Sequence, residues 1–216
     1  MKKIDNKHIY INRQNLVNNF DILKKRAGKS QIMSVIKGDA YGHGIQQCSD
    51  VLKKNGCKHF YVARLDDAIN LRKKYKKNIN IYLLSGTISK EICGYIKRYE
   101  ITPIINNLIQ LEIFNKFIPN INFVLHFDTG MNRLGFKIDE ISRTMELSVL
   151  KNIQFLMTHL SSADEQNLKE CQFQLNQLKK INKFFNKPLS IANSSGIFIG
   201  KAFHLYYVRP GKVFME

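Results

Sequence analysis

A single lysine, Lys37, stands between a short apolar run and a glycine-rich segment. The run is Ile32–Ile36, and residues 38–44 read Gly-Asp-Ala-Tyr-Gly-His-Gly. A lysine at the end of a buried strand is partly desolvated, which lowers the pKa of its amine and makes it a usable nucleophile toward an aldehyde. The glycines let the backbone and Tyr41 come close to a ligand. A lysine that merely reaches from a strand end into water is the simpler alternative.

Short apolar runs rich in β-branched residues recur along the chain, and amphipathic stretches with apolar residues at helical spacing follow them. The runs predict eight strands, at Ile32–Ile36, His59–Ala63, Ile79–Leu84, Ile101–Ile105, Asn122–Phe127, Gln154–Leu160, Leu189–Ala192 and Tyr206–Val208. Helices are predicted over Gln14–Arg26, Gln46–Lys54, Asp66–Tyr75, Lys90–Arg98, Asp139–Leu150 and Leu168–Phe185. Strands that alternate with helices favour parallel pairing through βαβ units.

The expected fold class is therefore α/β, as a (β/α)8 TIM-type barrel of parallel strands. An open, doubly wound sheet shares the same local pattern. Polar residues that could do chemistry follow the predicted strand ends, namely Lys37, Arg64, Asp128, His159, Asn193 and Arg209. In a barrel these ends converge on one face, where sites are built, so the barrel is the better interpretation.

The chain has 216 residues, of which 44% are hydrophobic and 24% charged, and this suits one globular domain or two small ones. Its apolar stretches fall well short of the ~20 residues that span a bilayer, and no apolar segment follows the basic N-terminus. The four cysteines are scattered without metal-ligand spacing. We therefore expect a cytoplasmic protein with reduced thiols, no membrane association and no metal.

The net charge of +17, with a pI of about 9.7, raises nucleic-acid or membrane-surface binding as an alternative. Lysine pairs are spread over predicted helices and loops, and no basic run is interleaved with aromatic residues that could stack on bases. The chain is also rich in Lys, Asn and Ile, as an AT-rich coding sequence produces. A compositional origin of the charge is therefore the better interpretation, with no nucleic-acid partner.

Four further strings combine residue types that can bind an anion or hold a proton. Residues 126–136 read His-Phe-Asp-Thr-Gly-Met-Asn-Arg-Leu-Gly-Phe, and residues 157–164 read Met-Thr-His-Leu-Ser-Ser-Ala-Asp. Residues 192–196 read Ala-Asn-Ser-Ser-Gly, in which a serine can offer its hydroxyl and N–H groups to a phosphate or simply cap a helix. Residues 208–211 read Val-Arg-Pro-Gly. The Asp-Thr-Gly triplet alone would fit an aspartic protease, but that class needs a paired Asp and an all-β fold.

Taken in order along residues 30–211, the five strings resemble the signatures of alanine racemases. The string around Lys37 is similar to K-x-x-A-Y-G-H-G, and residues 128–135 are similar to D-T-G-M-x-R-x-G. The resemblance implies an enzyme that uses pyridoxal 5′-phosphate (PLP) to interconvert L-alanine and D-alanine for peptidoglycan synthesis. It also implies a homodimer with alanine as its small-molecule substrate.

The resemblance further implies a role for each site residue. Lys37 is the catalytic residue and carries PLP as a Schiff base, while Arg133 hydrogen-bonds the phenolic oxygen of PLP and seats the substrate carboxylate. His159 and Asn193 lie beside the cofactor. Arg209 faces the pyridine nitrogen, which stays unprotonated because arginine does not give up its proton. The phosphate is held by Tyr41, Ser194, Gly211 and Lys212.

Two departures from the family pattern bear on activity. Many members carry a carbamylated lysine two residues before the aspartate, where it supports the arginine. His126 stands at that position here, so Arg133 needs another support. The family also continues into a mostly β-stranded C-terminal domain, which supplies a tyrosine to the partner's active site as the second catalytic base.

We therefore expect residues 1–216 to form a single PLP-binding barrel domain without that C-terminal domain, and Ile9–Ile11 to resemble a strand that pairs with it. With Lys37 as the sole base, one face of the α-carbon is unserved, so racemisation by this chain alone should be weak. A non-catalytic PLP-binding barrel, or a vestigial fragment, is the alternative.

Overall fold

Eight parallel strands close into a barrel in the computed structural model, which describes residues 10–140, 148–165 and 167–214. The strands are β1 (Gln31–Val35), β2 (His59–Val62), β3 (Asn80–Leu83), β4 (Thr102–Ile105), β5 (Phe123–His126), β6 (Ile153–Met157), β7 (Leu189–Ser190) and β8 (Tyr207–Val208). Each strand pairs with the next, and β1 closes the ring by pairing with β8 at Gln31↔Tyr207 and Ile32↔Val208. The expected (β/α)8 barrel is thus confirmed, and an open sheet is excluded.

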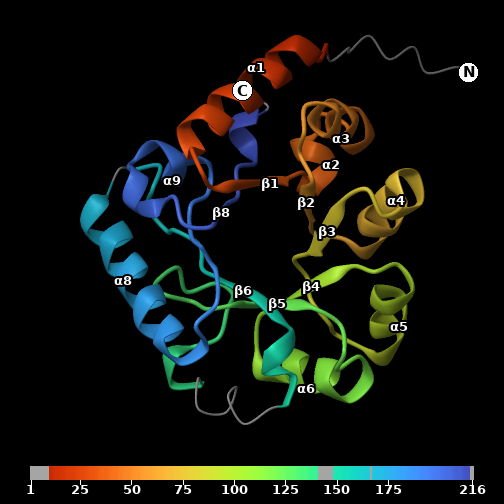
Figure 1. Ribbon diagram of the computed structural model, residues 1–216, viewed down its shortest axis with the longest axis vertical. Coiled ribbons are helices and arrows are strands. Elements are labelled where there is room, and N and C mark those ends of the chain that lie inside the picture. Colours follow the sequence, from red (N-terminus) through yellow and green to blue (C-terminus); the bar gives the residue numbers. More distant parts are fainter. Residues whose placement is uncertain (1–9, 141–147, 166, 215–216) are drawn as a thin grey trace, which may run out of the picture.

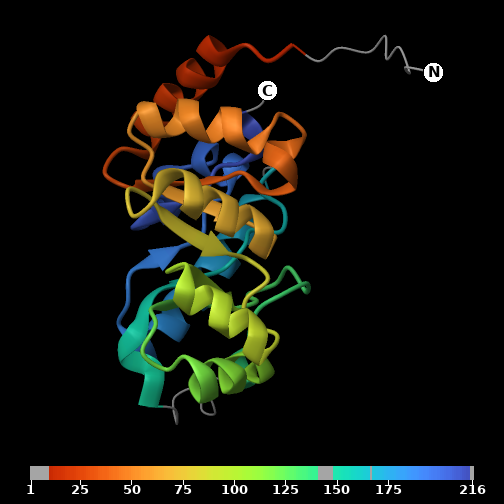
Figure 2. The same cartoon turned by 90° about the vertical axis from the view of Figure 1, so that its right-hand side faces the viewer.

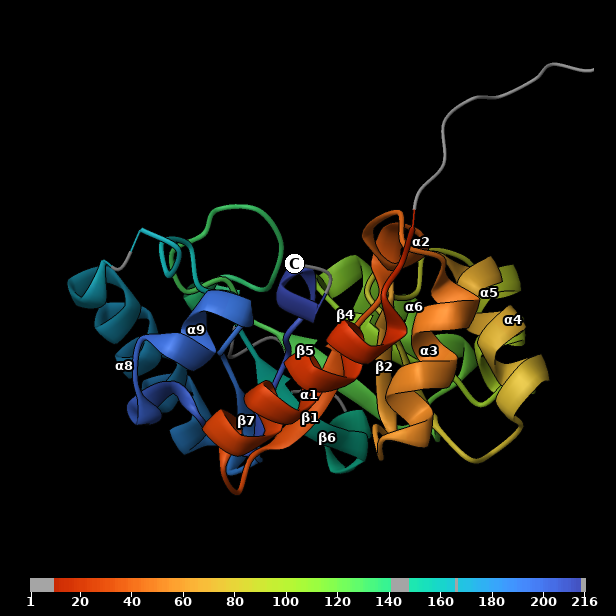
Figure 3. The same cartoon turned by 90° about the horizontal axis from the view of Figure 1, so that it is seen from above.

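Helices surround the strands as an outer ring (Figures 1 and 2). They are α1 (Arg13–Ala27), α3 (Ile45–Lys54), α4 (Leu65–Tyr75), α5 (Lys90–Arg98), α6 (Leu108–Phe117), α8 (Leu168–Phe185) and α9 (Ser194–Phe198). The short elements are α2 (Lys37–Tyr41), η1 (Ile138–Glu140), η2 (Ser148–Asn152), η3 (Lys201–Phe203) and η4 (Lys212–Phe214). Helix α1 lies beside η4 (Figures 1 and 3), where Asn19 Nδ2 donates to the Phe214 carbonyl at 3.1 Å.

Polar side chains set the starts of several helices. Asn12 accepts from the backbone N–H groups of the first turn of α1, and Ser89, Asn107 and Asn167 do the same for α5, α6 and α8. Such caps satisfy N–H groups that have no partner inside the helix. The chain therefore marks its helix starts locally, before any packing.

Strand and helix positions follow the sequence expectations closely in the described residues, with two differences. Strand β6 ends at Met157 and β7 at Ser190, so the polar residues that follow leave the sheet earlier than expected. Helix α6 was not among the predicted segments, because apolar residues lie on most of its circumference, including the exposed Ile109, and blur the helical period. Most of the predicted helix Asp139–Leu150 lies outside the described residues.

The barrel interior is closed by a layer of large side chains. Seven buried residues from six strands fill it: Met33, Tyr61, Tyr82, Ile104, Val124, Phe155 and Met157. Tyr61 stacks on Tyr82 with ring centroids 4.9 Å apart, and Phe155 meets Tyr207 at 4.6 Å. A second, larger cluster packs the outer faces of the strands against the helices. Because the interior is filled, the carboxyl-terminal ends of the strands are where a site can form.

Tyr10 and Ile11 do not form the strand expected at Ile9–Ile11, of which Ile9 lies outside the described residues. Tyr10 is 91% exposed and Ile11 is 37% exposed. No helix in the described part of the chain is both long enough and apolar enough to cross a membrane.

Candidate active site

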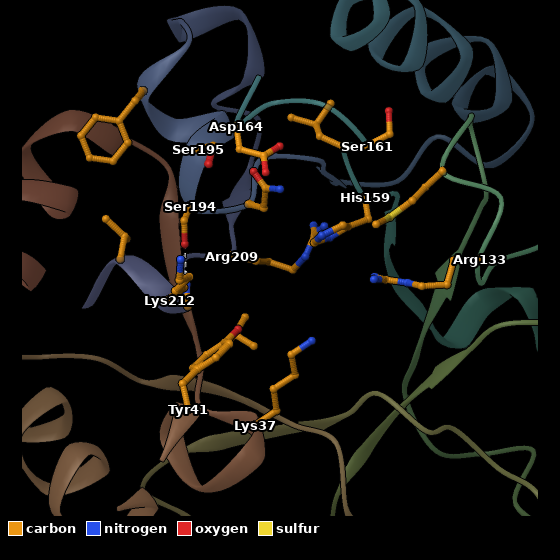
Figure 4. Close-up of a pocket in the computed structure, with 17 residues that line it drawn as sticks. Lys37, Tyr41, Arg133, His159, Ser161, Asp164, Ser194, Ser195, Arg209 and Lys212 are labelled. Atoms are coloured by element: carbon orange, nitrogen blue, oxygen red, sulfur yellow. Dashed lines mark hydrogen bonds between the residues drawn. The ribbon is translucent and has the colours of Figure 1, made fainter. Parts of the chain in front are cut away.

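A cavity of about 500 Å³ opens at the carboxyl-terminal ends of the strands. A second cavity, of about 350 Å³, is lined in part by Tyr61 and Met157 of the layer that fills the barrel interior. The residues that line both cavities are Val35, Lys37, Arg133, His159 and Arg209. We call them the outer and the inner cavity. All nine residues predicted for the site line the outer cavity (Figure 4): Lys37, Tyr41, Arg133, His159, Asn193, Ser194, Arg209, Gly211 and Lys212.

The outer cavity suits an anionic ligand. Four of its described lining side chains are cationic, namely Lys37, Arg133, Arg209 and Lys212, whereas Asp164 is the one acidic residue among them. Figure 4 shows Lys37, Arg133 and His159 directed into the same space from the segments that follow three different strands. The electrostatic potential that results favours a negatively charged group over a neutral one.

Lys37 enters the cavity from an unusual turn. The residues after it, Gly38, Asp39, Ala40 and Tyr41, have φ between 54° and 60°, so α2 is one left-handed turn and not an ordinary helix. Left-handed residues other than glycine cost roughly 1–2 kcal/mol each. Such a turn persists only where its surroundings hold it, and such strain clusters at functional sites.

Two side chains hold this turn. Asp39 Oδ1 accepts the backbone N–H of Ile45 at 2.7 Å, which ties the turn to the start of α3. His43 Nδ1 lies 3.2 Å from the Ala40 carbonyl and 3.1 Å from the Tyr41 carbonyl, so it must carry a proton and donate. The Asp and His of the glycine-rich string therefore build the turn that aims Lys37 and Tyr41.

The amine of Lys37 is half-buried in this position. Burial, and then the nearby charge of Arg133, lower the pKa of Lys37 from its usual value. A lowered pKa increases the fraction of unprotonated amine, which is the form that attacks an aldehyde. The environment therefore acts in the direction that the sequence predicted.

Arg133 reaches the cavity from a loop folded around one carboxylate. Asp128 Oδ1 accepts the backbone N–H groups of Gly130, Met131 and Asn132 at 3.0, 2.9 and 3.1 Å, and Oδ2 accepts that of Arg133 at 3.1 Å. Burial raises the pKa of Asp128, but the four N–H donors outweigh it and lower the pKa overall. The carboxylate of Asp128 therefore stabilises the loop through these four hydrogen bonds and is not directed at a ligand.

The same loop is closed by two backbone hydrogen bonds. Asp128 N–H donates to the Phe136 carbonyl at 2.9 Å, and Phe136 N–H donates to the His126 carbonyl at 2.8 Å. Gly135 has a φ of 122°, and a Cβ there would lie 2.5 Å from the Asp128 nitrogen. The loop that carries Arg133 therefore holds this arginine in a fixed place at the cavity. The guanidinium of Arg133 hydrogen-bonds to none of the described residues.

Tyr41, Ser194 and Gly211 converge on one wall of the cavity. The Gly211 N–H donates to Ser194 Oγ at 3.0 Å, and a side chain on Gly211 would overlap the Tyr41 hydroxyl. Asn193 Oδ1 accepts the Gly196 N–H at 2.8 Å, so Asn193 caps α9 and leaves the Ser194 hydroxyl to face the cavity wall. This wall can offer hydroxyl and amide donors to a phosphate.

Arg209 is buried at the end of β8. Its guanidinium donates to Ser190 Oγ and to the carbonyls of Thr158 and, at 3.4 Å, Ile191, which fixes its plane across the ends of β6 and β7. His159 stands beside it after β6. Burial, followed by the charges of Arg209 and Arg133, lowers the pKa of His159 to about 3. His159 is therefore neutral at physiological pH.

Sequence reasoning missed two residues that shape the site. Asn106 directly follows β4 and lines the inner cavity, and the strand-end rule used for the other site residues would have found it. Gln174 is buried on α8, where it accepts the Ser161 N–H at 2.9 Å and donates to the His159 carbonyl at 3.0 Å. Nothing in the sequence distinguishes it from other polar residues of that helix. Arg64 starts α4 and lines neither cavity.

Comparison with known proteins agrees with this geometry. Residues 11–215 match the family model described as alanine racemase, N-terminal domain. The chain is 36% identical over 211 residues to the alanine racemase of Rickettsia rickettsii, covering 94% of this chain and 59% of the relative. The relative from Rickettsia africae is 35% identical with the same coverage. The chain thus spans about three-fifths of the length of the curated relatives it matches.

Solved structures show the same likeness. The alanine racemase of Bartonella henselae with covalently bound pyridoxal phosphate superposes with a TM-score of 0.89 at 25% identity, covering 94% of this chain and 61% of that one. The alanine racemase of Acinetobacter baumannii gives a TM-score of 0.82 at 27% identity, covering 95% and 62%. The chain described here therefore belongs to the alanine racemase family, of which it contains the N-terminal barrel domain.

Proposed function

We propose that this chain binds PLP through Lys37 and forms the barrel domain of a PLP-dependent alanine racemase. The placement of Lys37 carries the proposal: a half-buried amine with a lowered pKa faces a cation-lined cavity. The donors around it fit an aldehyde that bears a phosphate. The absence of a Cβ at Gly211 leaves room for the Tyr41 hydroxyl beside Ser194. The covalently bound PLP of the Bartonella henselae relative supports the same choice.

The residues divide into those that hold the cofactor and those that act on the substrate. Tyr41, Ser194, Gly211 and Lys212 would bind the phosphate, with Asn193 and His159 beside the cofactor. Arg209 would donate to the ring nitrogen and, because arginine keeps its proton, would not protonate it. Arg133 would bind the substrate carboxylate through the planar fork of its guanidinium.

When bound, PLP supplies an electron-accepting ring that stabilises the charge left when an amino acid loses its α-proton. Lys37 would remove and return that proton at one face of the α-carbon, since its lowered pKa increases the fraction of free amine that can accept a proton. Because His159 is neutral, it does not compete with the lysine and arginine side chains of the cavity for the phosphate or the carboxylate. Alanine is the substrate that we propose, because the curated relatives are alanine racemases.

The test is a PLP titration followed by borohydride reduction. The wild-type chain should turn yellow with PLP, and reduction should fix the cofactor to the peptide that contains Lys37. Lys37→Ala should lose this adduct, whereas Lys179→Ala, at an exposed position on α8, should retain it. An equal yield of the fixed adduct in Lys37→Ala would refute the proposal. We further propose a homodimer, which light scattering on the PLP-loaded protein would detect.

A further inference from the structure

Gln174 is a polar residue that the fold buries completely. It lies on α8, and its side chain is 0% exposed. The other buried residues of this helix are apolar, namely Cys171, Leu175, Leu178, Ile181 and Phe185. Burying an amide costs free energy unless its polar atoms are hydrogen-bonded. The partners of Gln174 therefore show why an amide stands in this apolar face.

Both ends of the amide bind backbone groups of the segment that follows β6. Gln174 Oε1 accepts the N–H of Ser161 at 2.9 Å, and Nε2 donates to the carbonyl of His159 at 3.0 Å. An N–H can only donate and a carbonyl can only accept, so the orientation of the amide is fixed. A carboxylate here would set an oxygen against the His159 carbonyl, and an apolar side chain would leave both backbone groups unpaired. An amide satisfies both.

This segment has little other support from the backbone. Strand β6 ends at Met157, and the N–H of Thr158 still donates to the Ser190 carbonyl at 3.1 Å. The next three residues, 159–161, make no backbone–backbone hydrogen bond with any described residue. The backbone that carries the His159 ring is therefore held by a side chain of α8.

The same amide reaches the loop that carries Arg133. Gln174 Nε2 donates to Thr129 Oγ1 at 3.4 Å, and this hydroxyl is also 2.7 Å from Thr158 Oγ1. The carboxylate of Asp128 binds four consecutive backbone N–H groups of the loop, of which the last is that of Arg133. The loop is therefore one hydrogen-bonded unit from Asp128 to Arg133, and a contact that fixes Thr129 also fixes the backbone of Arg133.

We infer that Gln174 is a positioning residue, whose amide holds the His159 segment and the Arg133 loop in one fixed relation across the outer cavity. The inference rests on the proposed function, in which His159 lies beside PLP and Arg133 binds the substrate carboxylate. Gln174 itself lines neither cavity, so it acts only through these two segments. One amide thereby sets the distance between the cofactor neighbour and the carboxylate-binding arginine.

Two substitutions in the PLP-loaded chain test this link. The probe is propionate, which has a carboxylate but no amine, and its binding is measured by calorimetry. Gln174→Met keeps the length of the side chain and removes its hydrogen bonds. It should weaken propionate about tenfold, the size of one lost hydrogen bond to a charged group, and PLP about threefold. Thr129→Val removes the hydroxyl of the Arg133 loop and leaves Gln174 bound to His159 and Ser161. It should weaken propionate about tenfold and leave PLP affinity unchanged.

A purely structural role of Gln174 predicts a different pattern. Leu178→Ala truncates another fully buried side chain of α8 that lines neither cavity, so it destabilises the fold and should leave both affinities unchanged. The double variant of Gln174→Met and Thr129→Val should bind propionate about as weakly as either single variant, because both changes break the same link. Additive losses, or a loss in Leu178→Ala as large as that in Gln174→Met, would overturn the inference.

Gln174→Glu takes the place of Gln174→Met if the latter does not fold. It keeps an acceptor for the Ser161 N–H and loses the donor toward His159 and Thr129, so the same loss of propionate affinity is expected. Wild-type propionate affinity in the variant that folds would contradict the positioning role.

Amide hydrogen exchange in the cofactor-free chain gives a readout that does not depend on PLP. The Ser161 N–H should be protected in wild type and in Thr129→Val, and should exchange about tenfold faster or more in Gln174→Met. An unprotected Ser161 N–H in wild type would refute the inference. Failure of borohydride to trap PLP on Lys37, with Ser161 protected as expected, would count against the proposed function alone.

Discussion

The two ends of the barrel use arginine in opposite ways. Arg72 lies near the end of α4, at the amino-terminal ends of the strands, and donates to the carbonyls of Tyr99 at 2.8 Å, Ile79 at 2.9 Å and Glu100 at 2.8 Å. At the other end, the guanidinium of Arg133 hydrogen-bonds to none of the described residues. A guanidinium whose three nitrogens all donate to backbone carbonyls holds loops together. One whose donors are open can bind a ligand, in keeping with the division between the stability face and the active face of such barrels.

Backbone geometry shows the same division. Loops at the Arg72 end join regular helices to strands, with isolated non-glycine residues of positive φ at Lys76, Glu100 and Asn186. At the active end, four consecutive residues from Gly38 are left-handed, and Asp39 and His43 are needed to hold them. Strain is therefore concentrated where Lys37 must be aimed, and the opposite end supplies the stability that offsets it.

The largest expected effect is at the active end of the barrel, where one alanine enantiomer should exchange its α-proton and the other should not. With PLP present, this chain should exchange the α-proton of one alanine enantiomer, the D form according to the family resemblance, since Lys37 serves one face. The described tyrosines of the two cavities are engaged elsewhere: Tyr41 lies against Gly211, and Tyr61 donates to Met157 Sδ at 3.9 Å. His159, with a pKa of about 3, is too weak a base. Proton NMR in D₂O on separate L- and D-alanine samples measures this.

Comparable exchange from both enantiomers would mean that a second base already faces Lys37 within this chain. Exchange from neither, with PLP fixed to Lys37, would instead favour a PLP-binding barrel without catalytic activity. Lys37→Ala, loaded with PLP, is the control for exchange that does not depend on the lysine.

The second prediction tests the stability end. Arg72→Ala removes hydrogen bonds from a charged donor to several backbone carbonyls, and should lower the free energy of unfolding by about 3 kcal/mol. PLP affinity should stay unchanged, because Arg72 lies at the far end of the barrel. Arg98→Ala, at an exposed site on α5, should change stability by less than about 0.5 kcal/mol. Urea unfolding of the three proteins decides it, and equal losses in both variants would contradict the assignment.

The division between the two ends also explains what sequence reasoning could reach. Strand order and strand-end residues follow from hydrophobic period and topology, so all eight strands and the convergence of Lys37, His159 and Arg209 were predictable. The left-handed turn after Lys37 was not, because Asp and Ala are ordinary residues whose φ is set by tertiary contacts. The pairing of His126 with Asn106 was equally hidden, since only the closed barrel brings His126 Nδ1 to 2.9 Å from Asn106 Oδ1.

The third prediction uses acid to probe the active end. Below its unfolded pKa of 6.5, His126 takes up a proton in the unfolded chain but not in the folded one, where its pKa is about 3. The proton that His126 takes up on unfolding should therefore lower the free energy of unfolding by about 1.4 kcal/mol for each pH unit, as the pH is lowered from about 6 to about 4. His126→Asn lacks this loss, while both proteins keep the similar contribution of His159. Urea unfolding at several pH values should give a shallower slope for the variant, and parallel slopes would show that His126 is charged when folded.

The smallest expected effects come from two glycines. A Cβ on Gly211 would meet the tip of the Tyr41 side chain, which can move aside, whereas the space around Gly94 on α5 is empty to 4 Å. Gly211→Ala should therefore cost less than about 1 kcal/mol of stability, yet weaken PLP about tenfold by displacing the hydroxyl from the phosphate wall. Gly94→Ala should leave PLP binding intact and stabilise the fold by about 0.5–1 kcal/mol, as alanine does in a helix. Fluorescence titration of PLP with parallel thermal melts measures both. If Gly211→Ala binds PLP as tightly as Gly94→Ala, the Tyr41 hydroxyl does not contribute to the phosphate site, and the wall would consist of Ser194 and backbone amides alone.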